Sequence, residues 1–343
     1  MENKSDMHRE SPAEGAVGIT STIPIEVVYA ARRPVIDLNN VFINHIRSES
    51  LVERAERMGF PEASCAWIKG IYSAVHLEKV RTVIAVTQGD CSNTHALMET
   101  LETEGVETIP FLYPYDRDRE TLAHEINKLA GALGARAGDI AAAGGRLSAI
   151  RRKVAEIDRM TWSEGTVTGF ENHYFQVCCS DMNGDPDAFE AEVDEFLSRA
   201  AGREPLDRGL RLAYIGIPPI MSGIYEFIEA GGGRVVFNEL QRQFSLPFDC
   251  DDIVDRYLAY TYPYHIKHRL ADIVAEIDRR GVDGVIHYVQ SFCFRQIEDI
   301  IVRKRLDLPV LTLEGNRPGK LDLRTKMRIE AFLDMLRYMG QGD

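Results

Sequence analysis

No apolar run in this 343-residue sequence approaches the roughly 20 residues that a helix needs to span a membrane. The first segment, Met1–Gly18, is polar and lacks the apolar stretch that a secretory signal contains. From these two absences we expect a cytoplasmic protein with no membrane partner and with a mobile tail over residues 1–19.

Cysteine is scarce as well, with six residues in the whole chain. Six cysteines are too few to hold a protein of this length together as a disulfide scaffold. In a reducing cytosol they are thiols that pack in the core, bind a metal or react.

The nucleotide-binding motifs are missing too. The sequence contains neither G-x-G-x-x-G nor G-x-x-x-x-G-K-[ST], so we expect the chain neither to bind a dinucleotide in Rossmann fashion nor to hydrolyse ATP itself. Acidic residues outnumber basic ones by 53 to 40, and the resulting net charge of −13 disfavours nucleic acid as a partner.

What the sequence does contain is a repeated alternation of strand and helix patterns, which is typical of parallel sheets. We expect an α/β fold built from two similar doubly wound parallel-sheet domains, with an inter-domain cleft and extra helices. The predicted N-terminal domain covers residues 20–205 and includes a helical insertion. The predicted C-terminal domain covers residues 206–343.

One segment of each half shares a pattern. Val83–Cys91 aligns without gaps on Val285–Cys293 as Val-Ile-x-x-x-Gln-x-x-Cys, and each copy is followed by a predicted helix and then by a predicted strand that contains a proline. The match indicates a structural duplication. Val-Ile alone is common in parallel strands, but the shared Gln and Cys are harder to obtain from strand composition.

The cysteines of this pattern predict a metal site. Ligands of open α/β sheets bind beyond the carboxyl ends of the strands, where Cys91 and Cys293 are expected at the start of a helix, and a helix N-terminus favours a thiolate. Cys65, in a loop before another helix, supplies a third thiol, and we expect the three to converge between the domains. Three thiolates from separate segments suit a [4Fe-4S] cluster with one iron left for a non-protein ligand. Zinc, and simple packing of each cysteine, are the alternatives that the residues leave open.

The other cysteines and several polar residues have weaker patterns. Cys178 and Cys179 are adjacent and Cys250 is surrounded by aspartates, so we expect all three to be structural. Four polar residues near the expected strand ends are candidates for orienting the site, although each would serve equally well to tie loops together: Gln88, Gln290, Glu239 and Arg242.

The chain resembles the D-component family of 2-hydroxyacyl-CoA dehydratases, which includes 2-hydroxyglutaryl-CoA dehydratase, benzoyl-CoA reductase subunits and double-cubane cluster proteins. The resemblance extends from about Thr20 to Leu336. It lies in four segments, which are Ile23–Ala31, Gly89–Cys91, Gly284–Cys293 and Arg328–Leu333.

This resemblance implies a [4Fe-4S] cluster, or a double-cubane cluster, bound by Cys65, Cys91 and Cys293. It implies an ATP-dependent activator that injects one electron, a ketyl radical formed from a 2-hydroxyacyl-CoA, and elimination of water. It also implies a homodimer, or a heterodimer with a similar subunit. Ala66-Trp67 after Cys65 and Phe294 after Cys293 depart from the family pattern. Low-potential reduction of a small molecule and a non-catalytic electron-transfer role are therefore alternatives.

Overall fold

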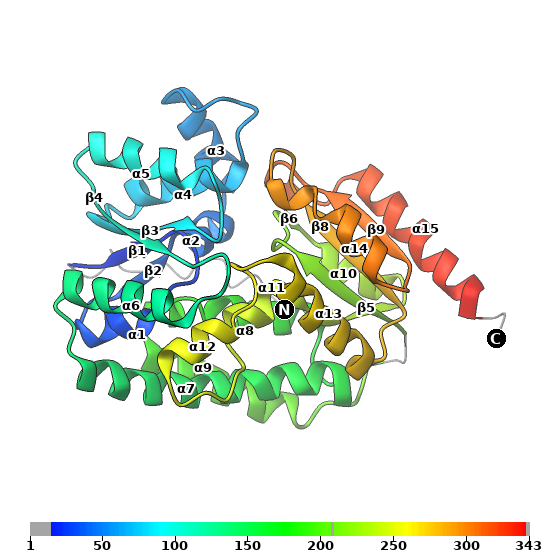
Figure 1. Ribbon diagram of the computed structural model, residues 1–343. Helices are drawn as coiled ribbons and strands as arrows, with labels where there is room; N and C mark the ends of the chain where they lie inside the picture. The colour runs from blue at the N-terminus through cyan, green and yellow to red at the C-terminus, as the bar shows by residue number, and fades with distance from the viewer. Residues whose placement is uncertain (1–14, 207–208, 341–343) are drawn as a thin grey trace. The chain divides into compact units, whose positions relative to one another are not determined.

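The computed structural model of the chain describes residues 15–206 and 209–340. These residues form two compact units, coloured along the chain in Figure 1. Unit 1 consists of the described residues up to Ala149 together with Cys178–Phe189 and Phe248–Tyr264. Unit 2 consists of Ile150–Val177, Glu190–Pro247 and the described residues from His265 onward.

In unit 1, four parallel strands among the described residues pair in the order β2-β1-β3-β4. They are β1 (Val17–Ile19), β2 (Val35–Asp37), β3 (Thr82–Gln88) and β4 (Glu107–Leu112). Val83 to Val86 are all buried, which explains the continuous apolar run that marks β3 in the sequence. The helices of this unit are α1 (Ile25–Ala30), α2 (Leu38–Asn44), α3 (Ser48–Arg57), α4 (Ala66–Leu77), α5 (Thr94–Thr103), α6 (Arg119–Leu133) and α12 (Ile253–Ala259), with a 3₁₀ turn η2 (Met182–Gly184).

In unit 2, the described strands form a second parallel sheet in the order β7-β5-β8-β9. They are β5 (Leu210–Gly216), β7 (Gly233–Asn238), β8 (Gly284–Val289) and β9 (Val310–Glu314). A small second sheet pairs β6 (Met221–Ser222) with β10 (Gly319–Lys320). The helices are α10 (Ile224–Ala230), α11 (Glu239–Phe244), α13 (Ile266–Arg280), α14 (Asp299–Arg305) and α15 (Leu323–Gly340), with a π-helical turn η1 (Met160–Glu164) and a 3₁₀ turn η3 (Phe294–Gln296). The helices α7 (Ala137–Arg159), α8 (Gly169–Cys178) and α9 (Pro186–Ala200) contribute residues to both units.

Helices cover both faces of the sheet in unit 2. Alternate residues of β5 point to opposite faces. On one face, Ala213 and Ile215 belong to an apolar cluster that includes residues of α13 and α14. On the other face, Leu336 of α15 packs closely against Gly284. This is the doubly wound arrangement that the sequence predicts.

The two sheets share one topology. In each, the first strand in the chain lies between the second and the third, and the fourth lies outside the third. The aligned segments coincide with β3 and β8, the third strand of each unit. The equal order supports a structural duplication.

Two local expectations differ from the structure. Residues 1–14 of the predicted tail lie outside the described residues, but Val17–Ile19 form the buried strand β1, because three apolar residues suffice to fill a place between β2 and β3. The helix that was expected to start at Cys293 is split into η3 and α14.

The chain also alternates between the units. Residues 178–189 and 248–264 group with unit 1, whereas a single boundary near residue 205 was expected. The division of the chain into an N-terminal domain over residues 20–205 and a C-terminal domain over residues 206–343 stays a prediction.

Candidate functional site

Cys65 lies at the start of a long helix. It is the N-cap residue of α4, and its carbonyl oxygen accepts a hydrogen bond from the Lys69 N–H at 3.3 Å. Its side chain belongs to the apolar cluster of unit 1 that includes Ile68, Val83 and Leu97. The Cys65 side chain therefore lies at the N-terminus of α4, the end of the helix that carries the positive partial charge of the dipole.

Cys91 follows β3 and packs against the same apolar cluster. Its carbonyl oxygen accepts a hydrogen bond from Thr94 N–H at 3.1 Å, which opens α5. Gly89, two residues earlier, has φ +100°, and a Cβ there would lie 2.8 Å from Pro263 Cβ. The chain can make this turn beside Pro263 only with glycine, so the position of the Cys91 loop is fixed by close packing.

Cys293 has the same local pattern in unit 2. Its carbonyl oxygen accepts from Gln296 N–H at 3.0 Å, and this turn is the 3₁₀ segment η3. Since α14 begins only at Asp299, Cys293 does not lie at the N-terminus of an α-helix as expected. The stabilisation of a thiolate by a helix dipole therefore applies to Cys65 and not to Cys293.

The two glutamines of the shared pattern tie equivalent loops together. Gln88 Nε2 donates to the carbonyl oxygen of Tyr113, just after β4, at 3.1 Å. Gln290 Nε2 donates to the carbonyl oxygen of Asn316, just after β9, at 3.3 Å. In both units the glutamine thus connects the end of the third strand to the segment after the fourth, and so helps to position the cysteine loop.

A small pocket opens beside Cys293 within unit 2. Its volume of about 10 Å³ is close to the minimum that holds one water molecule. The lining comes from the ends of β5 and β8, from the loop after β8 and from α13, and it includes Gly216, Arg269, His287, Gln290, Cys293 and Arg295.

Arg269 is held in this pocket by two carboxylates. Its guanidinium forms two contacts with Glu239, one of them at 2.8 Å, and its Nη1 lies 2.7 Å from Glu298. Glu239 also accepts a hydrogen bond from Gly216 N–H at 2.9 Å. Burial alone would raise the pKa of Glu239, but the charge and hydrogen bonds of Arg269 hold that pKa below its usual value. Glu239 is therefore a fixed anion that orients Arg269.

A histidine and an aspartate form a second fixed pair at the pocket. His287 Nδ1 lies 2.7 Å from Asp299 Oδ1, and Thr312 Oγ1 donates to the same oxygen at 2.7 Å. Burial alone would raise the pKa of Asp299, but these hydrogen bonds hold that pKa well below its usual range. An ionised Asp299 keeps the proton of His287 on Nδ1 and fixes the ring.

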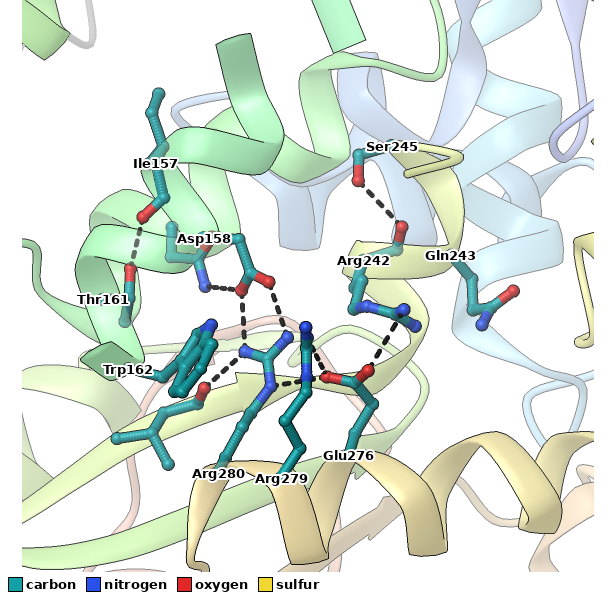
Figure 2. A network of polar contacts seen from close by, with 12 residues as sticks. Ile157, Asp158, Thr161, Trp162, Arg242, Gln243, Ser245, Glu276, Arg279 and Arg280 are labelled. Atoms are coloured by element: carbon teal, nitrogen blue, oxygen red, sulfur yellow. Dashed lines mark hydrogen bonds and ion pairs between the residues drawn. The ribbon is translucent and has the colours of Figure 1, made fainter. Parts of the chain in front are cut away.

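Arg242 belongs to a different network, which Figure 2 shows from close by. Its Nη1 lies 3.0 Å from Asp272, and its Nη2 lies 3.3 Å from Glu276. Glu276 in turn contacts Arg280 at 2.7 Å, and Arg280 forms two hydrogen bonds with Asp158 at 2.6 and 2.9 Å. The network joins α7, α11 and α13 in the interior of unit 2, and Arg242 is not among the residues that line the pocket of Cys293.

The other three cysteines have the surroundings of packing residues. All six cysteines lie within the described residues, and none is joined in a disulfide. Cys178 and Cys179 are buried. Burial raises the pKa of Cys250. The charge of Arg256 opposes this shift, and the charges of Asp255, Asp249 and Asp251 add to it. A thiolate is disfavoured there, as the sequence predicts.

The structure brings some of the predicted residues together. Cys65 and Cys91 meet one apolar cluster of unit 1, while Cys293, Gln290 and Glu239 lie at or against one pocket of unit 2. Convergence of the three cysteines stays a prediction, because they belong to different units. In the part of the chain that the structure describes, no group of three or more His, Cys, Asp or Glu side chains has an arrangement suited to a metal ion.

Sequence reasoning missed the pair of His287 and Asp299. A signal was available, since His287 stands in the middle of the strand pattern Val285–Val289, where a polar residue needs a buried partner. The identity of that partner, twelve residues further on, carries no sequence signal.

Comparison with known families identifies the chain. Residues 20–336 match the family described as 2-hydroxyglutaryl-CoA dehydratase, D-component. The protein belongs to this family and is a 2-hydroxyacyl-CoA dehydratase-like protein. No curated protein matches the sequence closely enough to add to this assignment. Among the described helices, none has the length and apolar character needed to cross a membrane.

Proposed function

We propose that the protein is an iron–sulfur enzyme that eliminates water from a 2-hydroxyacyl-CoA through one-electron chemistry. The observation that carries this proposal is the equal position of Cys91 and Cys293, each just after the third strand of a sheet with the same strand order. Ligand-binding residues of open α/β sheets lie at this end of the strands. The family membership supports the same reaction class.

The residues present fit an iron–sulfur cluster. Cys65, Cys91 and Cys293 are thiols that begin a helix or turn, and the α4 dipole favours a thiolate at Cys65. We propose these three as the ligands of a [4Fe-4S] cluster or of a double-cubane cluster. When bound, the cluster would supply a low-potential electron to the thioester.

The chain's own side chains would shape the site around it. Gln88 and Gln290 hold the two cysteine loops in place through the segments after β4 and β9. Glu239 orients Arg269 at the pocket, and Asp299 orients His287. Because Arg269 and His287 are buried, the polar groups that they present are fixed in orientation and shielded from bulk water.

The proposal includes three partners. An ATP-dependent activator would deliver the electron, since this sequence has no motif of its own for ATP hydrolysis. A second similar subunit, identical or paralogous, would complete a dimer, and an acyl-CoA would be the substrate. A cytoplasmic location is part of the same proposal.

The size of the pocket favours a second candidate function. A volume of about 10 Å³ beside Cys293 admits a water-sized molecule and not an acyl chain. Low-potential reduction of a small molecule at the same cysteines is therefore the alternative, and transfer of electrons without catalysis is the outcome if neither substrate reacts.

Anaerobic purification followed by iron and sulfide analysis tests the proposal first. We expect about four irons and four sulfides per chain, or about eight for a double cubane, together with thiolate-to-iron absorption that disappears in air. Incubation of the reduced protein with a 2-hydroxyacyl-CoA should then give the enoyl-CoA. Absence of iron contradicts the proposed cofactor. An iron-loaded protein that leaves the hydroxyacyl-CoA intact but reduces a small substrate supports the alternative.

A further inference from the structure

The indole N–H of Trp67 is a buried hydrogen-bond donor at the start of α4. Trp67 stands two residues after Cys65, in the first turn of the helix. Part of its ring is exposed, but the Nε1 atom is buried and takes part in no hydrogen bond within the described residues. An unpaired buried donor costs free energy, so its presence in a folded protein calls for an explanation, such as an acceptor that arrives with a ligand.

The indole ring packs where the cysteines of unit 1 pack. Trp67 contacts the apolar cluster that contains Cys65, and Cys91 contacts the same cluster. Phe42 lies edge-on to the indole ring, with the ring centroids 5.5 Å apart and an interplanar angle of 83°. Trp67 therefore shares its surroundings with two of the three proposed cluster ligands.

The chemistry of the donor limits what can pair with it. Tryptophan only donates, and its N–H is fixed in the plane of the ring, so it cannot turn to another acceptor as a hydroxyl does. The face of the Phe42 ring is a weak acceptor. An enclosed water molecule needs two or more polar partners, whereas the cluster around Trp67 is apolar. A sulfur atom of an iron–sulfur cluster accepts hydrogen bonds and needs no further polar partner.

We infer that the indole N–H of Trp67 donates a hydrogen bond to a sulfur atom of the iron–sulfur cluster and thereby raises its reduction potential. The inference rests on the proposed function, because it requires a cluster bound by Cys65 and Cys91. Reduction adds one negative charge to the cluster, so a donor stabilises the reduced state more than the oxidised state. Trp67 thus sets the potential at which the protein accepts its electron.

Trp67→Phe tests the inference, because it removes the N–H and keeps an apolar aromatic ring. Purified without oxygen, the variant should keep its iron and show a more negative potential in a spectroscopic redox titration. We expect the equilibrium constant for reduction to fall about tenfold, which corresponds to about 59 mV for a one-electron couple. Water that entered beside the smaller ring would shift the potential in the positive direction, because water stabilises the added charge. The sign of the shift therefore separates a lost hydrogen bond from a change in exposure.

Trp162→Phe is the matched control. Trp162 is the second of the two tryptophans in the chain and lies in unit 2. The guanidinium groups of Arg279 and Arg280 lie over its ring, at 5.0 and 5.6 Å from the centroid. The potential of this variant should equal that of the unaltered protein. An unchanged or more positive potential in Trp67→Phe would overturn the inference, as would an equal negative shift in both variants.

A second measurement uses the unaltered protein, so it does not depend on the folding of Trp67→Phe. The two indole N–H signals are recorded by NMR in the ¹⁵N-labelled protein with and without iron, and the spectrum of Trp162→Phe assigns them. Loading with iron and sulfide should shift or broaden the Trp67 signal and slow the exchange of its proton with deuterium, while the Trp162 signal stays unchanged. A Trp67 signal that is the same in both forms would overturn the inference and assign the N–H to the face of the Phe42 ring.

Iron analysis of the same preparations separates the inference from the proposed function. A protein without iron contradicts the proposed cofactor, and the inference falls with it. An iron-loaded protein in which Trp67→Phe leaves the potential unchanged contradicts the inference alone and leaves the proposed function standing.

Discussion

The loop after β3 and the loop after β8 follow the same strand in two sheets of equal order, yet their surroundings differ in chemistry. Beside the first loop lie aromatic rings, with Tyr113 packed edge-on against Tyr260 and Tyr264. Beside the second lie buried charges, Arg269 with Glu239 and His287 with Asp299. One topology thus places aromatic rings beside the loop after β3 and ionised groups beside the loop after β8.

This difference indicates a division of roles. The two units share their strand order and the positions of Cys91 and Cys293. We assign these shared features to the duplicated scaffold that would hold the proposed cluster. The pocket lined by Arg269 and His287 belongs to unit 2, so we assign it to the contacts made by that half. Replacing residues at corresponding positions tests whether the two units differ as described.

The largest effect is expected at Gly216, at the end of β5. Its φ is +95°, and a Cβ there would lie 2.2 Å from the carbonyl oxygen of Tyr288. The pairing of β1 with β3 and of β5 with β8 shows which residue of unit 1 corresponds to Gly216, and that residue is Ser21. Only unit 2 therefore requires glycine at this position. Gly216→Ala should lower the free energy of unfolding by about 4 kcal/mol in urea titrations.

Gly223→Ala is the control for the cost of placing a residue other than glycine at a positive φ. Gly223 has φ +85° but open space where a Cβ would lie, so only conformational strain applies, about 1 kcal/mol. Similar losses for both variants would show that the close approach to Tyr288 is not what requires glycine.

A smaller effect is expected when one buried acid of each unit is made neutral. Glu239→Gln leaves the guanidinium of Arg269 with a single carboxylate and should cost about 3 kcal/mol of stability. Glu26 of unit 1 accepts a hydrogen bond from Tyr257 at 2.9 Å and lies 3.6 Å from Arg256. An amide can still accept from Tyr257, so Glu26→Gln should cost about 1 kcal/mol.

Chemical denaturation of Glu239→Gln and Glu26→Gln at pH 7 measures the difference between their free energies of unfolding. Equal costs would contradict the view that unit 2 depends more strongly on buried charge.

The two units should also respond oppositely to pH through one aspartate each. The pKa of Asp299 is held below its ordinary value of 3.8, so its contribution to stability is present above that value and is lost as the pH falls. Burial raises the pKa of Asp37 in unit 1 above 3.8. Its contribution to the stability of the fold is therefore complete below pH 3.8 and is lost as the pH rises through the raised pKa.

Stability of Asp299→Asn and Asp37→Asn between pH 3 and 7 checks these signs. Relative to the unaltered protein, Asp299→Asn should lose more stability at pH 7 than at pH 3. The stability of Asp37→Asn, relative to that of the unaltered protein, should be higher at pH 7 than at pH 3. The same sign for both variants would show that the two carboxyl groups are not in opposite environments.

The smallest effect concerns the two glutamines. Gln290 is buried and Gln88 is exposed, although both donate to the segment after the fourth strand. Gln290→Ala should cost about 1.5 kcal/mol because it removes a buried side chain together with its hydrogen bond, and Gln88→Ala less than about 0.5 kcal/mol. A thermal unfolding comparison of the two is sufficient, and a larger loss for Gln88→Ala would reverse the assignment.

Much of the scaffold could be predicted because its strands carry strong local signals. Val83–Val86 is a continuous apolar run, and the run Val285–Val289 is interrupted only by His287. The alternation of such strands with helices predicts parallel sheets, but it does not give the order of the strands. The strand Val17–Ile19 is only three residues long, so its burial depends on neighbours that no local pattern reveals.

The candidate site was harder to predict. The Gln and Cys of the repeated pattern predicted the loops after β3 and β8, because both residues stand at a fixed number of positions from the end of the strand. The partners Asp299 and Glu298 depend on the path of a distant helix, and the positive φ of Phe292 depends on the loop as a whole. Ionic and conformational details of this kind are tertiary properties, which residue type alone does not specify.

The most direct test of the central claim is the iron content of two cysteine variants purified without oxygen. Cys293→Ala removes one of three proposed anchors and should retain less than about a fifth of the iron of the unaltered protein. Cys179 is buried and assigned to packing, so Cys179→Ala should retain its iron. Equal iron in the unaltered protein and Cys293→Ala, or loss of iron in Cys179→Ala alone, would contradict the ligand assignment and the function proposed from it.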